Sequence, residues 1–113
     1  MGLDQVAYAK EHGTEVQQDV ATWRKHPNLQ GYMERLWRNR GNQGEFNCVS
    51  VELSEQDIRD LATAIVDKDL PETVGFFYGS DSDNYYQSQD LEFCAKALDL
   101  LKSGSKVYYS SWW

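Results

Sequence analysis

The sequence has 113 residues, of which 41% are hydrophobic and 13% aromatic, and its formal net charge is −7. This length and composition are typical of one globular domain with its own core, which excludes an intrinsically disordered chain. The excess of acids argues against direct binding to nucleic acid or to an anionic membrane, and the lack of a run of about 18 apolar residues predicts no membrane span.

Residues 1–13 show little hydrophobic pattern, and we expect them to form a frayed or short helical start. Thr14 and Gln17 have the spacing of a helix capping box. Apolar residues then recur at the spacing of one helix face, at positions Val16, Val20 and Trp23. This pattern predicts an amphipathic helix that ends before Pro27, because proline disfavours helical geometry in the residue that precedes it.

A second helix is predicted after Asn28, which can cap it. Its apolar face is the clearest periodic pattern in the first half of the chain and consists of Leu29, Tyr32, Met33, Leu36 and Trp37. Gly41 ends this helix. The alternation of residues 46–53 then predicts a half-buried strand, with Val49, Val51 and Leu53 on one face.

A helix capped by Ser54 follows, and its apolar stripe ends at Val66. Thr73–Tyr78 is predicted to be a short strand between two glycines. Ser88 is predicted to cap the last helix, whose wide apolar face indicates that it is covered on two sides. Residues 106–113 are predicted to form the last strand.

The predicted order is therefore helix, helix, strand, helix, strand, helix, strand in a single domain of residues 1–113. We expect an α+β fold in which helices cover a three-stranded sheet. A small α/β arrangement, with parallel strands joined by right-handed crossovers, is the alternative. The aromatic pairs Tyr108–Tyr109 and Trp112–Trp113 predict a docked C-terminal strand in which one member of each pair faces the core.

Cys48 and Cys94 lie far apart in the sequence, each beside apolar residues. We expect buried free thiols, with a disulfide or a redox pair as the alternative. Residues 1–6 have neither a basic start nor an apolar run, so no signal peptide is predicted and a cytoplasmic protein is expected.

Charge is unevenly distributed along the chain. Residues 24–40 contain five basic residues and one acid, whereas residues 52–92 contain eleven acids against Arg59 and Lys68. This predicts a molecule with a basic end and a broad acidic face, unless both are ordinary solvated helix faces.

Motifs for catalysis or cofactor binding are not found. Residues 75–80 (GFFYGS) have bulky aromatics where a phosphate loop has small residues, and no lysine follows. The two histidines, His12 and His26, have no spaced partner for a zinc site or an activated nucleophile. We therefore expect no metal, no cofactor and no catalytic residue.

The acidic segment that follows residue 80 invites two interpretations. Asp81 and Asp83 have the spacing of the first two ligands of a calcium loop, but the match fails where Tyr85 and Tyr86 replace a further ligand and a glycine. A solvated turn is favoured. Because exposed tyrosines beside acids are typical of a protein-binding patch, the predicted partner-binding residues are Asp81, Asp83, Tyr85 and Tyr86.

Several separate motifs lie between residues 22 and 113: WRKHPNLQGYM, FNCV, LP, GFFYG and the terminal YYSSWW. Together they resemble a family of small bacterial and phage proteins, including cyanophage members, for which no function is established. The resemblance implies an origin in a phage or a bacterial cytoplasm, and it supplies no catalytic residues.

We therefore expect a non-enzymatic interaction protein, a phage or prophage accessory factor whose acidic face binds a basic surface of a host protein. Mimicry of a nucleic acid is a specific version of this hypothesis, which the basic second helix disfavours. The alternative is a small ligand-binding domain or enzyme, with a pocket beside residues 75–80 that is formed by Trp23, Arg24 and His26. An exposed strand edge or aromatic patch would also allow a homodimer.

Overall fold

The computed structural model describes residues 3–11, 13, 16–70 and 82–112, excluding the side chains of residues 82–85. Its elements are β1 (Asp4–Lys10), β2 (Gln17–Arg24), α1 (Pro27–Asn39), β3 (Ser50–Leu53), α2 (Glu55–Val66), α3 (Ser82–Lys102) and β4 (Lys106–Trp112). The fold is a single α+β domain, as predicted. The predicted order of elements and the predicted three-stranded sheet are wrong, because two strands precede the first helix.

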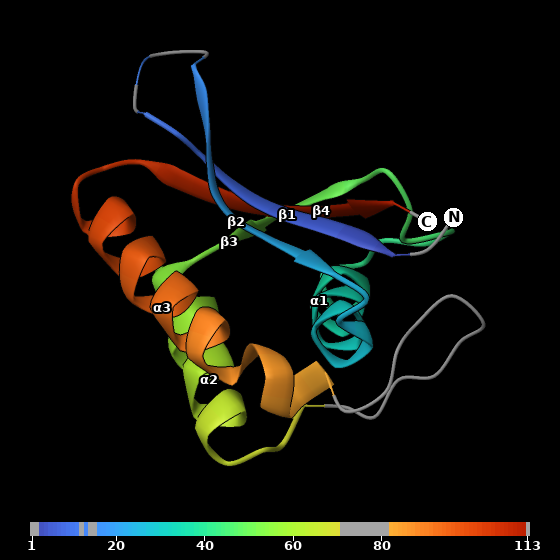
Figure 1. Ribbon diagram of the computed structural model, residues 1–113. Coiled ribbons are helices and arrows are strands. Elements are labelled where there is room, and N and C mark those ends of the chain that lie inside the picture. The colour runs from blue at the N-terminus through green and yellow to red at the C-terminus, as the bar shows by residue number, and fades with distance from the viewer. Residues whose placement is uncertain (1–2, 12, 14–15, 71–81, 113) are drawn as a thin grey trace.

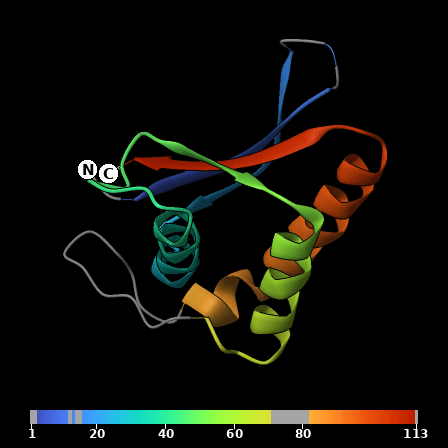
Figure 2. The ribbon, with the colours of Figure 1, turned by 180° about the vertical axis from the view of Figure 1, so that it is seen from behind.

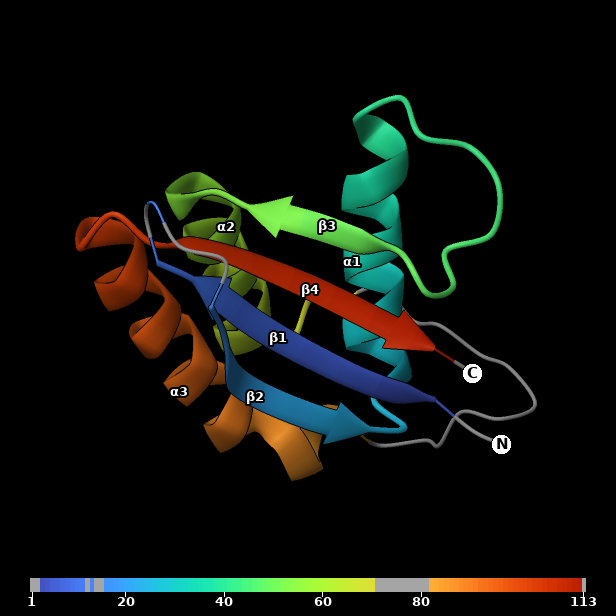
Figure 3. The ribbon, with the colours of Figure 1, turned by 90° about the horizontal axis from the view of Figure 1, so that it is seen from above.

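Strand β1 lies inside the sheet, where a frayed or helical start was predicted. The strand order is β2-β1-β4-β3 and every pairing is antiparallel (Figure 3), which excludes the parallel alternative. The buried positions of β1 hold Gln5, Ala7 and Ala9. Because these inward residues are small or polar, the sequence of β1 does not show the alternation of large apolar and polar residues that is typical of a half-buried strand. Pairing along both edges, rather than large apolar side chains, therefore holds β1 in place.

Residues 17–24 form strand β2 instead of the predicted helix. Of the residues with helical spacing, Trp23 is buried whereas Val16 is 69% exposed, so no common face exists. The register with β1 shifts between Ala7 and Tyr8, which marks a bulge in the hairpin. A bulge interrupts the alternation of side chains and bends the strand. The helical spacing is thus a coincidence that pairing with β1 overrides.

The three helices of the described chain all lie on one face of the sheet, and the other face carries no helix (Figures 1 and 2). Helix α1 lies beneath one end of the sheet, and the α2–α3 pair lies beneath the other (Figure 1). The core between these layers includes Trp23, Leu29, Met33, Val51, Leu53, Ile58, Leu61, Phe93, Val107 and Tyr109. The predicted covering of the sheet by helices is therefore correct for one face only.

Helices α1 and α2 lie where the sequence predicted them, but the predicted cap of α1 is wrong, because His26 rather than Asn28 occupies the N-cap position. Pro27 occupies the first turn of α1, where its fixed φ suits the helix and its missing N–H costs nothing. Ser54 caps α2 in a capping box, in which its side chain accepts from the backbone N–H of Asp57 while the Asp57 carboxylate accepts from the Ser54 N–H. Helix α3 begins at Ser82 rather than after Ser88. None of the helices in the described ranges is both long and apolar enough to cross a bilayer.

Strand β3 covers only the second half of the predicted strand 46–53. Val51 and Leu53 are buried as predicted. Phe46 is also buried, although it precedes the strand, and its ring lies 5.2 Å from the ring of Trp37. The predicted strand at residues 73–78 lies outside the described part of the chain.

The C-terminal strand β4 confirms the predicted docking of this segment as far as Trp112. Tyr109 is fully buried, its neighbour Tyr108 is half-buried, and Trp112 is 46% exposed. The alternation predicted for the tyrosine pair is therefore confirmed, and Trp113 lies outside the described residues.

The two cysteines are both free thiols, but only Cys94 is buried. Burial, with a smaller effect of the nearby Asp90 carboxylate, raises the pKa of the Cys94 thiol to about 12 and keeps it protonated. Cys48 is exposed in the loop before β3, so the predicted burial is wrong for this residue.

Candidate functional site

The helix-free face of the sheet has its outward side chains fixed by the strand register, and we call it the open face. Its residues are Asp4, Val6, Tyr8 and Lys10 of β1, Gln17, Asp19, Thr22 and Arg24 of β2, Lys106, Tyr108, Ser110 and Trp112 of β4, and Ser50 and Glu52 of β3. The solvated face of an antiparallel sheet is commonly polar. This face combines charged residues with two tyrosines and a tryptophan.

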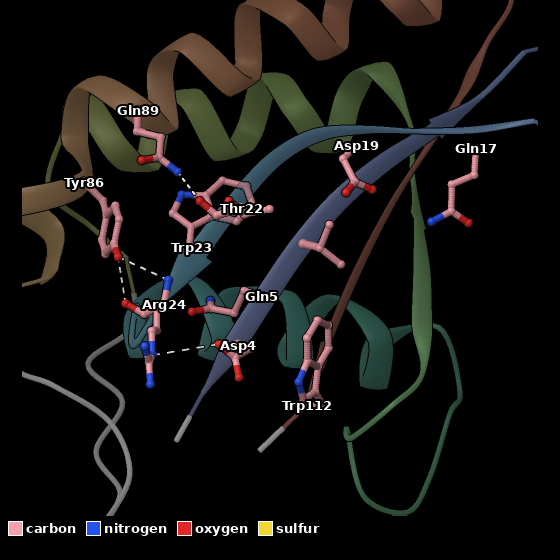
Figure 4. A pocket seen from close by; sticks show the side chains of 11 residues that line it. Asp4, Gln5, Gln17, Asp19, Thr22, Trp23, Arg24, Tyr86, Gln89 and Trp112 are labelled. Atoms are coloured by element: carbon pink, nitrogen blue, oxygen red, sulfur yellow. Dashed lines mark hydrogen bonds and ion pairs between the residues drawn. The ribbon is translucent and has the colours of Figure 1, made fainter. Parts of the chain in front are cut away.

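A groove of about 700 Å³ crosses the β1–β2 half of the open face (Figure 4). Its lining includes Asp4, Asp19, Thr22, Arg24, Tyr86 and Trp112. Trp112 pairs directly with Asp4 across the strands, and its exposed ring closes one side of the groove (Figure 4). The groove therefore offers one aromatic ring beside charged groups.

The charged groups of the groove are only loosely paired. Arg24 Nε lies 4.0 Å from Asp4 Oδ1, with side chains that are 72% and 45% exposed. Ion pairs between exposed side chains contribute about 0–1 kcal/mol. Asp19 forms no ion pair with any residue that the structure describes. Both carboxylates can therefore accept a cation from another molecule.

The centre of the open face is an aromatic pair. The rings of Tyr8 and Tyr108 stack with their centroids 5.1 Å apart, and Lys10 Nζ lies 5.7 Å from the centre of the Tyr108 ring. The Tyr8 hydroxyl is hydrogen-bonded to Ser50 Oγ at 2.7 Å, two strands away. These contacts fix the position of both rings at the centre of the open face, and a surface that is already ordered loses less entropy when another molecule binds it.

The outer edge of β2 is closed by side chains of α3. The Tyr86 hydroxyl donates to the backbone carbonyl of Arg24 at 2.7 Å and accepts from the Arg24 N–H at 3.1 Å. Gln89 Nε2 donates to the Thr22 carbonyl. Unpaired strand edges invite the addition of a further strand. Because this end of the edge is capped, the open face, rather than the β2 edge, is the accessible surface here.

A buried polar network supports the groove from beneath, and the Asp90 carboxylate is its first centre. One carboxylate oxygen accepts from Trp23 Nε1 at 2.7 Å, and the other is hydrogen-bonded to His26 Nε2 at 2.8 Å. All three residues are at most 3% exposed. Buried polar groups are stable only when they are hydrogen-bonded. Asp90 therefore ties α3 to β2 and to the residue that precedes α1.

Tyr109 is the second centre of the network. Gln5 Nε2 donates to the Tyr109 hydroxyl at 2.8 Å, and this hydroxyl donates to Gln30 Oε1 at 2.6 Å. The Gln5 side chain also bonds the backbone of His26, accepting from its N–H at 2.9 Å and donating to its carbonyl at 3.0 Å. Strands β1 and β4 are thereby joined to α1, which fixes the floor of the groove.

A histidine paired with a carboxylate is also a common catalytic arrangement. A general base must come within hydrogen-bond reach of the proton that it removes. His26 is 0% exposed, and the Tyr86 ring stacks on its ring with centroids 4.9 Å apart. The His26–Asp90 pair therefore acts as a structural support and does not line the groove.

The structure gathers part of each predicted site in one place. Trp23 and Arg24, predicted for the pocket, line the groove together with Tyr86, which was predicted for partner binding. His26 lies behind them in the core. Helix α3 contains Asp83 and Tyr85, whose side chains lie outside the described part of the structure, as do Asp81 and residues 75–80.

Two of the five basic residues of the predicted basic end, Arg38 and Arg40, form contacts within the fold. Arg38 binds Glu34 at 2.8 Å and the Gly44 carbonyl at 2.8 Å. Arg40 binds Asp57 and the Glu52 carbonyl. These two arginines join the C-terminal end of α1 to the following loop, to β3 and to the start of α2, so both have a structural role.

Sequence reasoning missed most of the open face. Asp4, Tyr8 and Asp19 were not considered, because the first 24 residues were not expected to contain strands. The available signal was the alternation of polar or large residues with Gln5, Ala7 and Ala9, which indicates a strand only when its pairing partners are known.

No group of three or more His, Cys, Asp or Glu side chains in the described ranges is arranged to hold a metal ion. Comparison of the chain with protein-family models, with curated proteins and with solved structures found no match.

Proposed function

We propose that this chain is a non-enzymatic interaction protein that docks another protein on its open face. The observation that carries the proposal is a sheet covered by helices on one side only, whose other side has a stacked tyrosine pair and a tryptophan that is 46% exposed. Tryptophan and tyrosine are enriched in protein interfaces and carry much of their binding energy. Trp112 is the proposed anchor.

The charges favour a partner that brings basic groups. The chain has a net charge of −7, and the groove contains Asp4 and Asp19 against Arg24. Opposite charge steers encounter and fixes the register of a complex. A phage or prophage accessory factor that modulates a host protein with a basic surface would use these features.

A small ligand is the second candidate occupant, because the groove volume of about 700 Å³ falls within the range of small-molecule sites. Such a ligand would stack on Trp112 and pair with Arg24. A ligand that raises the melting temperature of the wild-type chain, but not of Trp112→Ser, would favour this candidate over protein docking.

The test is capture from host lysate on immobilised full-length chain, read by mass spectrometry. We expect wild type to retain one protein stoichiometrically and Trp112→Ser to lose it, while both keep the same circular dichroism spectrum. Val66→Ser is the matched control, because Val66 is 60% exposed on α2, on the helix side of the sheet. Equal capture by wild type and Trp112→Ser, with loss in Val66→Ser, would refute docking on the open face.

A further inference from the structure

The register and charges of the open face identify an occupant with matching chemistry. We infer that a second copy of this chain docks there, related to the first by a two-fold axis that crosses the strands. This inference rests on the proposed use of the open face for protein docking. In this dimer the basic groups that bind the groove of one copy are lysines of the other copy.

Two copies of a chain with a charge of −7 repel each other at long range. The open face carries no net charge. Its three basic residues, Arg24, Lys10 and Lys106, balance its three acidic residues, Asp4, Asp19 and Glu52. The repulsion between copies is therefore weakest when the open faces meet.

The charges of the open face are arranged in rows across the strands. The row at one end is Arg24–Asp4–Trp112, and the row at the other end is Gln17–Lys10–Lys106. A two-fold axis that crosses the strands places each end row over the opposite end row of the partner. Lys10 then lies over Asp4 of the partner subunit, and every such contact occurs twice.

The same two-fold axis also gives favourable contacts for other residues of the open face. Lys106 lies over the ring of Trp112 of the partner subunit, which is a favourable cation–π arrangement. Tyr8 lies over Val6 of the partner subunit, so apolar surface meets apolar surface at the centre. An axis that runs along the strands would instead place Asp19 over Glu52 of the partner subunit, and this repulsion disfavours it.

A single copy carries a repulsion of its own on the open face. Lys10 and Lys106 are direct cross-strand partners, and like charges in this position destabilise a sheet. Asp4 of the partner subunit offsets that repulsion. Beyond the bulge, the last part of β1 and the first part of β2 rise out of the open face (Figure 1) and so reach toward the second copy. Two faces packed in this way form an aligned sheet sandwich with the helices outside.

The test is the mass of the full-length chain in solution, measured by sedimentation equilibrium over a concentration series. We expect twice the chain mass of 13.1 kDa at high concentration. Lys10→Asp converts two attractions into two repulsions and should weaken dimerisation by about tenfold or more. Lys10→Asp combined with Asp4→Lys exchanges the charges and should restore the dimer. Lys102→Asp makes the same charge change at the exposed end of α3 and should leave the dimer intact.

A wild-type chain that stays monomeric throughout the series would overturn the inference, as would a double variant no more dimeric than Lys10→Asp. Failure of this inference alone can be told apart from failure of the proposed function. If the chain is monomeric and Trp112→Ser still loses a captured host protein, docking on the open face holds and only the second copy is wrong.

Discussion

Replacing Asp90 by alanine should destabilise the protein by about 3–5 kcal/mol, because it leaves buried partners of a carboxylate without their acceptor. Both carboxylate oxygens are engaged, one by Trp23 Nε1 and one by His26 Nε2. Trp23, His26 and Asp90 are each at most 3% exposed, so bulk solvent does not reach these groups in the folded chain. The measurement is urea denaturation followed by circular dichroism.

Asp99→Ala is the matched control, because it removes an exposed carboxylate from the same helix. It should change the free energy of unfolding by no more than about 0.5 kcal/mol. Asp90→Asn, which keeps one acceptor, should fall between the two. An Asp90→Ala variant as stable as Asp99→Ala would show that the network does not hold α3 against the sheet.

Tyr109→Ala should cost about 3–5 kcal/mol, since it removes a fully buried aromatic ring from the centre of the core. Tyr109→Phe removes the hydroxyl and keeps the ring, so it measures the contribution of the hydroxyl alone. Gln5 Nε2 donates to this hydroxyl and Gln30 Oε1 accepts from it, so its loss removes one buried hydrogen bond from each glutamine and should cost about 1–3 kcal/mol. The free energy of unfolding of each variant measures these effects.

The adjacent residue provides the control for this prediction. Tyr108 lies on the opposite face of β4 and is half-buried against Tyr8. Tyr108→Phe keeps the stacked ring and should be nearly neutral. If Tyr108→Phe were as destabilising as Tyr109→Phe, the assignment of the two faces of β4 would be wrong.

The sequence predicted the elements whose signals are local. The N-cap residue Ser54 and the continuous apolar stripes of residues 29–37 and 58–66 identify α1 and α2 without knowledge of any distant residue. The alternation of Tyr108 and Tyr109 likewise requires only that residues 106–112 form a strand. These signals are encoded within a few residues of the elements that they define.

The first two strands carry no such local signal. Strand β1 turns Ala7 and Ala9 inward, and its stability comes from pairing with β4 about a hundred residues away. In β2 the bulge removes strict alternation and leaves a spurious helical spacing. A pattern search cannot recover strands that are specified by partners elsewhere in the chain.

The candidate site was predictable only in part for the same reason. Trp23, Arg24 and Tyr86 were identified and do meet in the groove, although they were assigned to two separate sites. Asp4 and Trp112 lie at opposite ends of the chain and become neighbours only through the β1–β4 pairing. Surfaces assembled from such distant segments require the topology to be known first.

The most direct test of the open face as a docking surface is oxidative footprinting of the chain, free and bound to the protein that it captures or to a second copy at high concentration. We predict that binding lowers the oxidation of Trp112 and Tyr108 and leaves Val66, on the helix side, unchanged. Protection of Val66 with no change at Trp112 and Tyr108 would contradict the account, because it would place the contact on the helices.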